Sequence, residues 1–269
     1  MTAVLDIKQL SLQTKTARLL SGVDLTIAPG ERVGLIGESG SGKSLTAMAA
    51  TGLLPTTMRA TGAITLAGKP VLGASERQLN QLRGTAAAVV FQEPLTALDP
   101  LMRIGRQIAG PLRRRVRHDG QRLGGVGLEQ AILALMADVA LPDPQRIARA
   151  YPHEISGGQR QRVAIAMALA CKPSLLIADE PTTALDVTTQ AEILRLLDRL
   201  VRERSMALLF ISHDLPVVAG IVDRVTVLRK GEVVETGPVG TVFSQPQHPY
   251  TQSLGGAAHQ FDTALGGES

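Results

Sequence analysis

A run of eight residues near the N-terminus has the composition of a phosphate-binding loop. It follows the pattern G-x-x-x-x-G-K-S and consists of Gly37, Glu38, Ser39, Gly40, Ser41, Gly42, Lys43 and Ser44. Glycines let the backbone curl without side-chain clashes, so successive N–H groups can point into one cavity. The lysine would reach the β- and γ-phosphates of a nucleotide, and Ser44 would ligate Mg²⁺. The alternative is a glycine-rich turn that binds nothing, and a chance match is expected roughly once in a hundred chains of this size.

The residues on either side of this loop supply the structural context that the chemistry requires. Residues 32–36 form a short apolar run of strand type, and residues 45–50 are compatible with a helix. A helix that starts directly after the loop adds the positive end of its dipole to the backbone N–H groups. The strand–loop–helix order therefore predicts that this chain binds ATP together with Mg²⁺.

Two adjacent carboxylates follow a second apolar run. Residues 175–178 are apolar and lead directly into Asp179 and Glu180. A carboxylate at the first position can hold Mg²⁺ through water, and the second is a candidate for polarising an attacking water molecule. The alternative is an acidic pair that caps a helix before Pro181, but the phosphate-binding loop upstream favours the catalytic interpretation.

A second stretch has the features of an anion site. It consists of Ser156, Gly157, Gly158 and Gln159, at the predicted start of a helix. A single nucleotide has little use for two separate anion-binding sites within one small core. Two chains placed head to tail would instead present the phosphate-binding loop of one and the Ser156 loop of the other to the two faces of ATP. The alternative is an ordinary helix with a serine at its N-cap.

The apolar patterns predict an α/β fold with a P-loop core, a mostly parallel sheet, an N-terminal antiparallel β subdomain and a helical insertion subdomain. Alternation predicts an exposed edge strand over residues 4–12 and a second half-solvated strand over residues 23–27. Further strands are expected at 62–68, 86–91, 174–180, 207–211, 223–228 and 232–235, with helices at 156–170 and 188–202.

These elements predict one ATPase domain over residues 1–255, with the helical insertion at about 101–170, followed by a short disordered tail at 256–269. Ligands of such a fold sit at the carboxyl ends of the strands. Gln92, the carboxylates described above and His213 all fall at predicted strand ends.

Composition narrows the class of function. Hydrophobic residues make up 44% of the chain, which indicates a globular protein, but aromatic residues make up only 2%. Stacking surfaces for bases are therefore scarce, which argues against a protein that binds single-stranded nucleic acid, and no nucleic-acid partner is expected. The formal net charge is +4, with much of the excess at residues 103–122. This arginine-rich run could bind nucleic acid, anionic lipid or a protein partner, or it could form a solvated helix face.

The remaining global features predict a cytoplasmic location. The first residues carry no signal-type pattern, and the chain contains no apolar run of about 18 residues that could span a membrane. The single cysteine, Cys171, cannot form an internal disulfide, and we expect it to pack in the core.

Several motifs together resemble those of a known family. Residues 155–159 resemble the signature motif of ABC ATPases, and the resemblance covers about residues 4–253. The other matching motifs stand in the family's order and spacing: the phosphate-binding loop, Gln92, residues 175–180, residues 184–186 and His213. The resemblance implies an ATP-sandwich dimer in which Glu180 is the general base and His213 contacts the γ-phosphate. It also implies that Gln92 senses Mg²⁺ and couples to a membrane partner, and that Asp186 contacts the other subunit.

Four further segments resemble the peptide/nickel importer branch of that family, namely residues 91–100, 151–154, 178–187 and 248–251. This resemblance implies two membrane permease subunits, an extracytoplasmic substrate-binding protein and a peripheral position on the cytoplasmic face of the inner membrane. Paired but distinct ATPases are common in the branch, so we expect a heterodimer with a second, similar ATPase, and a homodimer is the alternative. Di- or oligopeptides are the expected substrates. The short stretch after residue 251 and the absence of a cysteine-rich tail make nickel or a metal chelate the alternative.

Two other functions fit the sequence less well. DNA-acting relatives carry a long coiled coil that the spacing from Ser44 to Ser156 cannot hold, and ribosome-acting relatives usually carry two ATPase halves in one chain. A non-hydrolysing regulator would not need Glu180, His213 or the Ser156 loop.

One family feature is missing. ABC ATPases usually place an aromatic residue upstream of the loop to stack on adenine, but this chain has no Phe, Tyr or Trp before Phe91. Arg18 is the only planar side chain in residues 14–20, and a guanidinium can stack on a base. Arg18 is therefore predicted to replace the aromatic residue, and the alternative is an exposed loop arginine that touches nothing.

Overall fold

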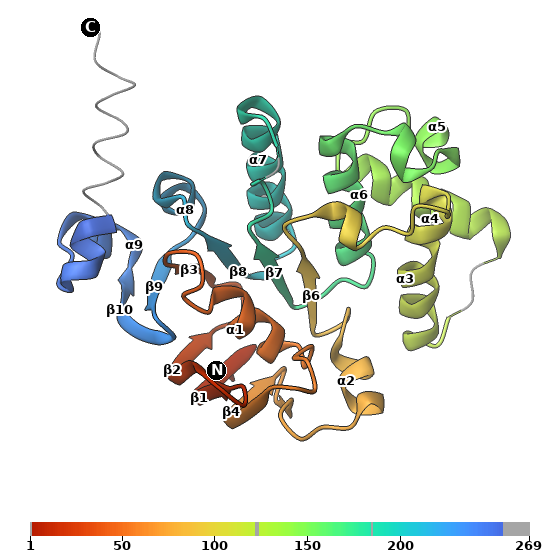
Figure 1. The fold of residues 1–269 in the computed structure, drawn as a ribbon. Helices are drawn as coiled ribbons and strands as arrows, with labels where there is room; N and C mark the ends of the chain where they lie inside the picture. The colour runs from red at the N-terminus through yellow and green to blue at the C-terminus, as the bar shows by residue number, and fades with distance from the viewer. Residues whose placement is uncertain (1, 122–123, 184, 255–269) are drawn as a thin grey trace, which may run out of the picture. The chain divides into compact units, whose positions relative to one another are not determined.

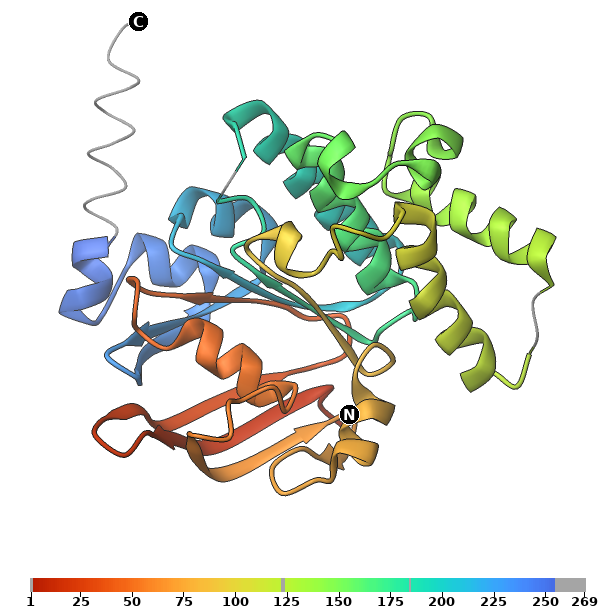
Figure 2. The ribbon, with the colours of Figure 1, turned by 45° about the vertical axis from the view of Figure 1, so that its right-hand side comes forward.

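The computed structural model describes residues 2–121, 124–183 and 185–254. The chain divides into two compact units (Figures 1 and 2). Of the described residues, the first unit comprises 2–79 and 207–254, and the second comprises 80–121, 124–183 and 185–206. The predicted tail at 256–269 and Ala184 lie outside the described residues. Among the helices of the described segments, none has the length and apolar composition needed to cross a bilayer.

The first unit contains an antiparallel sheet with the strand order β2-β1-β4-β5. Its strands are β1 (Leu5–Gln13), β2 (Arg18–Ile27), β4 (Arg59–Leu66) and β5 (Lys69–Pro70), and the red and orange strands lie side by side in Figure 2. The prediction of an edge strand at residues 4–12 is wrong, because β1 pairs with β2 on one side and β4 on the other. Alternation shows that one face of a strand is buried, but it carries no information about which backbone edges are paired.

The first unit also contains the strands that carry the phosphate-binding loop. They are β3 (Arg32–Ile36), β8 (Ala207–Ser212), β9 (Arg224–Arg229) and β10 (Glu232–Pro238). The strand β3 runs parallel to β8 and to β9, and β10 returns antiparallel to β9. Every residue of β8 is buried, as expected for a parallel strand covered on both faces. The helices of this unit are α1 (Lys43–Ala50), α8 (Leu215–Ile221) and α9 (Val239–Ser244), and residues 249–254 form a further helical turn. The helix α2 (Glu76–Leu82) contains the boundary between the units.

The second unit is mainly helical. Its strands β6 (Ala87–Val90) and β7 (Leu175–Asp179) are parallel. Its helices are α3 (Ile104–His118), α4 (Gly125–Asp138), α5 (Pro144–Arg149), α6 (Gly157–Leu169) and α7 (Val187–Glu203), with 3₁₀ turns η1 (Pro94–Thr96) and η2 (Pro152–Glu154). The helix α7 begins and ends within one residue of its predicted bounds. Its face with Ile193, Leu197 and Leu200 is buried, as its spacing predicts.

Cys171 lies in the core of the second unit, as predicted. Its side chain is 2% exposed, and its thiol donates to the carbonyl of Pro111 over 3.3 Å. Burial raises the pKa of the Cys171 thiol above its usual value. Within the arginine-rich run, Arg115 donates to the carbonyl of Cys171 and pairs with Asp119, so this arginine holds helix α3 against the residues after α6.

Gly62 in β4 and Gly68 in the turn between β4 and β5 allow a test of how closely β1 and β4 approach each other. Gly62 has φ +105°, and a Cβ there would lie 2.5 Å from the carbonyl oxygen of Gln9. Gly68 also has a positive φ, +74°, but nothing lies within 4 Å of its Cβ position. Gly68→Ala should cost roughly 1–2 kcal/mol of stability through its backbone conformation alone.

Gly62→Ala should cost roughly 1–3 kcal/mol more, because the strands must move apart. Melting temperatures of the two variants compare the effects directly. Equal losses at the two positions would contradict the close contact between β1 and β4.

Candidate nucleotide-binding site

The phosphate-binding loop connects β3 to α1, and two of its glycines are required by contacts. A Cβ at Gly37 would lie 2.1 Å from the carbonyl oxygen of Leu228, and a Cβ at Gly42 would lie 2.4 Å from a methyl group of Leu20. Both glycines have positive φ, +152° and +105°, in which side-chain-bearing residues are strained. The pattern of glycines in the sequence therefore reflects how closely β9 and β2 approach the loop.

Lys43 lies inside the loop. Its side chain is buried, and its ammonium group donates to the carbonyl oxygens of Gly37 over 2.8 Å and Glu38 over 3.1 Å. The first turn of α1 contains no acidic residue, and Ser44 in that turn is exposed. A helix N-terminus, a tightly curved backbone and a buried ammonium together fit a polyphosphate. The exposed Ser44 hydroxyl fits a ligand of the accompanying Mg²⁺.

Residues close to the C-terminus support this loop from outside. The N–H of Gly231, in the turn between β9 and β10, donates to the carbonyl of Ser41 over 3.0 Å. The N–H of Glu38 donates to the hydroxyl of Tyr250 over 2.8 Å. Sequence reasoning assigned no role to Tyr250. The only available signal was its position in the segment 248–251, which resembles the importer branch.

His213 lies at the same sheet edge as the start of the loop. The last residues of β3 and β8, Ile36 and Ser212, are partners in the parallel register. The residues that follow them are Gly37 and His213, and the histidine side chain is exposed. Asp214 caps the next helix by accepting from the N–H of Val217, which fixes the turn that carries His213.

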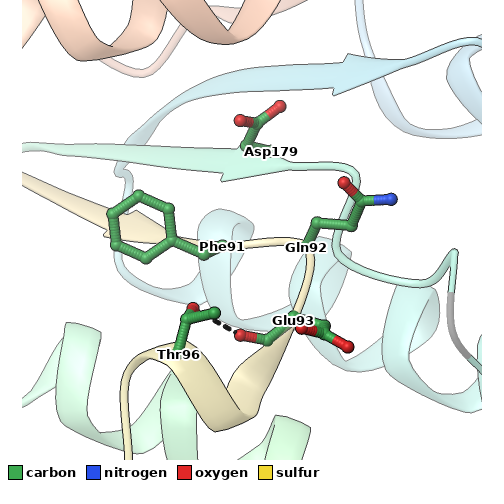
Figure 3. Close-up of a pocket in the computed structure, with 5 residues that line it drawn as sticks. All are labelled: Phe91, Gln92, Glu93, Thr96 and Asp179. Carbon is green, nitrogen blue, oxygen red and sulfur yellow. Dashed lines mark hydrogen bonds between the residues drawn. The ribbon is translucent and has the colours of Figure 1, made fainter.

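In the second unit, Gln92 and Asp179 line one hollow of about 490 Å³ together with Phe91, Glu93 and Thr96 (Figure 3). Asp179 is the last residue of β7, and Gln92 follows the end of the parallel strand β6. Their oxygen atoms suit Mg²⁺, which takes few protein ligands and keeps water or phosphate oxygens in its remaining positions. The described residues contain no cluster of three or more His, Cys, Asp or Glu that could hold a metal ion.

Glu180 has an unusual backbone conformation. Its φ is +47°, in the left-handed region that non-glycine residues rarely adopt, and such strain is concentrated at functional sites. Its carboxylate accepts a hydrogen bond from the hydroxyl of Thr183 over 3.0 Å. The turn therefore redirects Glu180 away from the line of β7, on which Asp179 lies.

The Ser156 loop begins helix α6 with a capping box. The hydroxyl of Ser156 accepts from the N–H of Gln159 over 3.3 Å, and the N–H of Ser156 donates to the side chain of Gln159 over 3.1 Å. A Cβ at Gly158 would lie 2.6 Å from a methyl group of Thr189. The glycine therefore lets the start of α6 approach the start of α7.

Asp186 caps helix α7 and contacts the same threonine. Its carboxylate accepts from the N–H of Thr189 over 2.9 Å, and this bond lowers the pKa of Asp186 below its usual value. The structure thus brings Asp186 and Gly158 together on Thr189, although they are far apart in sequence. The predicted site residues form two groups: the loop, Arg18 and His213 in the first unit, and Gln92, both carboxylates, the Ser156 loop and Asp186 in the second.

Arg18 is not in a loop, contrary to the sequence-based alternative. It is the first residue of β2 and pairs with Gln13 of β1. It is exposed and lines a hollow of about 350 Å³ that also contains Arg59, Gln13 and Thr61. Stacking of Arg18 on adenine stays a prediction.

Comparison with known proteins places this fold and site in a family. A family model described as ABC transporter matches residues 20–183. The oligopeptide transport ATP-binding protein OppD of Salmonella typhimurium is 47% identical over 244 residues, which cover 91% of this chain and 71% of OppD. The peptidoglycan transport ATP-binding protein YejF of Agrobacterium fabrum is 49% identical over 89% of this chain, but the match spans only 43% of YejF. Among solved structures, the dimeric ATP-binding cassette MJ0796 with ADP and Pi has a TM-score of 0.77 and 30% identity, covering 87% of this chain and 98% of that one.

The fold and site define an ATP-binding cassette ATPase. The chain belongs to the ABC transporter family, and its relatives place it in the peptide-importer branch. The predicted fold class and family are confirmed.

The exposed position of Arg18 in this hollow allows a test of whether Arg18 stacks on the adenine base of ATP. If Arg18 stacks on adenine, Arg18→Ala should raise the dissociation constant for ATP roughly 5- to 150-fold, because stacking is worth about 1–3 kcal/mol. Maximal turnover should change little, because the phosphate contacts remain. Arg59→Ala, which removes the other arginine of the hollow, is the matched control. Titration of both variants with ATP and GTP measures these affinities. An unchanged affinity of Arg18→Ala for ATP would exclude the stacking role.

Proposed function

We propose that this chain is the ATP-hydrolysing subunit of an ABC importer that takes up di- or oligopeptides. The observation that carries the proposal is the joint presence of a phosphate-binding loop, two carboxylates after β7, the Ser156 loop and His213 in a chain 47% identical to an oligopeptide transport ATP-binding protein. The names of the relatives favour peptides over nickel or a metal chelate.

Binding begins at the phosphate-binding loop. The ammonium of Lys43 leaves the carbonyl oxygens of Gly37 and Glu38 and turns to the β- and γ-phosphates. The backbone N–H groups at the start of α1 donate to the same phosphates. Ser44, Gln92 and Asp179 would hold Mg²⁺, which neutralises charge on the transferred phosphoryl group.

Hydrolysis requires a base and a group that stabilises the γ-phosphate. Glu180 accepts a proton from a water molecule whose oxygen forms a bond to the γ-phosphorus, while the bond to the β–γ bridging oxygen breaks. The products are ADP and inorganic phosphate. His213, at the strand end beside the loop, donates to a γ-phosphate oxygen and stabilises the charge in the transition state.

A second ATPase subunit completes the site in this proposal. The Ser156 loop and Asp186 face the nucleotide and the surface of that subunit, and MJ0796, a structural neighbour, is dimeric. The partner is a second, similar ATPase, and the pair docks on two membrane permeases at the cytoplasmic face of the inner membrane. An extracytoplasmic binding protein delivers the substrate.

Replacement of the proposed base separates binding from hydrolysis. Glu180→Gln should bind ATP with near wild-type affinity but lose steady-state turnover, with a rate at least ~100-fold lower, because only proton transfer is removed. Lys43→Ala is the contrasting variant, since it should weaken nucleotide binding itself. Binding titrations and phosphate-release assays on both proteins provide the comparison. Hydrolysis by Glu180→Gln at the wild-type rate would show that another group is the base.

The identity of the partner can be tested by purification. Co-expression of the tagged chain with its candidate permeases and a second ATPase should yield a complex with one copy of each ATPase. The reason is the resemblance to the peptide/nickel importer branch, in which paired but distinct ATPases are common. A stable, ATP-hydrolysing transporter that contains two copies of this chain and no second ATPase would exclude the heterodimer.

A further inference from the structure

The hydroxyl of Tyr250 forms a contact with the phosphate-binding loop across 212 residues of sequence. It accepts a hydrogen bond from the N–H of Glu38 over 2.8 Å. The side chain of Tyr250 is only 7% exposed, and burial raises the pKa of its hydroxyl above the usual value. The hydroxyl therefore stays protonated and available at neutral pH.

The same peptide group of the loop is held from its other side by Lys43. The carbonyl of Gly37 and the N–H of Glu38 belong to one planar peptide unit. The carbonyl accepts from the Lys43 ammonium over 2.8 Å, while the N–H donates to Tyr250. When Lys43 turns to the phosphates of a nucleotide, its bond to the Gly37 carbonyl is lost. The bond from the Glu38 N–H to Tyr250 remains and fixes the orientation of this peptide unit.

Tyr250 is itself held in place by its own segment and by β9. The guanidinium of Arg229 lies 4.8 Å from the centre of the tyrosine ring, in a cation–π arrangement. The N–H of Tyr250 donates to the ring nitrogen Nδ1 of His248 over 3.1 Å.

The turn that carries Tyr250 is tied to β10. The carboxylate of Glu235 accepts from the N–H groups of Gln247 and His248 over 2.9 and 3.0 Å. Burial alone would raise the pKa of Glu235, but these N–H groups hold the pKa below its usual value. The carboxylate is therefore ionised at neutral pH, when it accepts both bonds most strongly.

We propose that Tyr250 is a positioning residue for nucleotide binding, whose hydroxyl holds the first peptide unit of the phosphate-binding loop in its binding orientation. The inference rests on the proposed function of this loop. It also gives a role to the segment 248–251: His248 orients the tyrosine backbone, and Tyr250 contacts the loop. A preorganised loop binds phosphates without first losing conformational freedom.

The test removes only the hydroxyl. Tyr250→Phe keeps the ring and its contact with Arg229, but leaves the N–H of Glu38 without its partner. The loss of this one hydrogen bond should raise the dissociation constant for ATP roughly 2- to 12-fold. The turnover number at saturating ATP should stay within about twofold of wild type, because no reacting atom is touched.

The matched control is Ser253→Ala, which lies in the same helical turn. The hydroxyl of Ser253 donates to the carbonyl of Tyr250 over 2.7 Å and is not bonded to the loop. Its removal should leave ATP affinity at the wild-type value. An unchanged ATP affinity in Tyr250→Phe would overturn the proposal, and so would an equal loss in Ser253→Ala, which would indicate general loosening of the turn.

Two further measurements complete the test. The first distinguishes a positioning role of Tyr250 from a purely structural role, and the second tests the proposed function of the loop independently. The melting temperature of nucleotide-free Tyr250→Phe should fall by only about 1–6 °C, because a single hydrogen bond is lost, and a larger decrease accompanied by an equal loss of turnover would show a purely structural role. Lys43→Ala, titrated in parallel, should lose ATP binding. If Lys43→Ala binds ATP as wild type does, the proposed function of the loop fails, whatever Tyr250→Phe does.

Discussion

The nucleotide site depends on the close approach of β9 and β2 to two glycines of the phosphate-binding loop, Gly37 and Gly42. The backbone at Gly37 lies against the carbonyl of Leu228 at the end of β9, and Gly42 lies against Leu20 of β2. Any Cβ at either position would occupy space already filled by these neighbours. The loop conformation that presents N–H groups to phosphates is therefore held by the surrounding sheet strands as much as by its own sequence.

This constraint explains why both ends of the chain contribute to one unit. The strand β2 comes from the N-terminal sheet, while β9, β10 and Tyr250 come from the C-terminal part. The turn between β9 and β10 bonds to the loop at Ser41 and to β2 at Ser21. Residues that are distant in sequence thus form one frame around the loop. The second unit, in turn, uses helix caps at Ser156 and Asp186 to fix the groups proposed to face another subunit.

Local sequence patterns were sufficient for the loop, for most strands, for the helices α1, α6 and α7, and for the family. The edge position of β1 was predicted wrongly, because pairing partners are decided by long-range topology that alternation does not report. The contact of Tyr250 with the loop could not be predicted for the same reason, because it depends on how the fold brings residue 250 next to residue 38. The meeting of Gly158 and Asp186 on Thr189 is equally non-local. The positive φ of Glu180 also has no signal in the residue type, since glutamate rarely adopts it.

The central claim is that the backbone N–H groups of this loop bind the phosphates of ATP, while the first N–H is already held by Tyr250. Residue-resolved amide hydrogen exchange, measured with and without ATP, tests it most directly. The account predicts that the Glu38 amide is protected in both states, and that the amides from Gly40 to Ser44 exchange more slowly when ATP is added than without it. Equal exchange of the Gly40 to Ser44 amides with and without ATP would contradict the account.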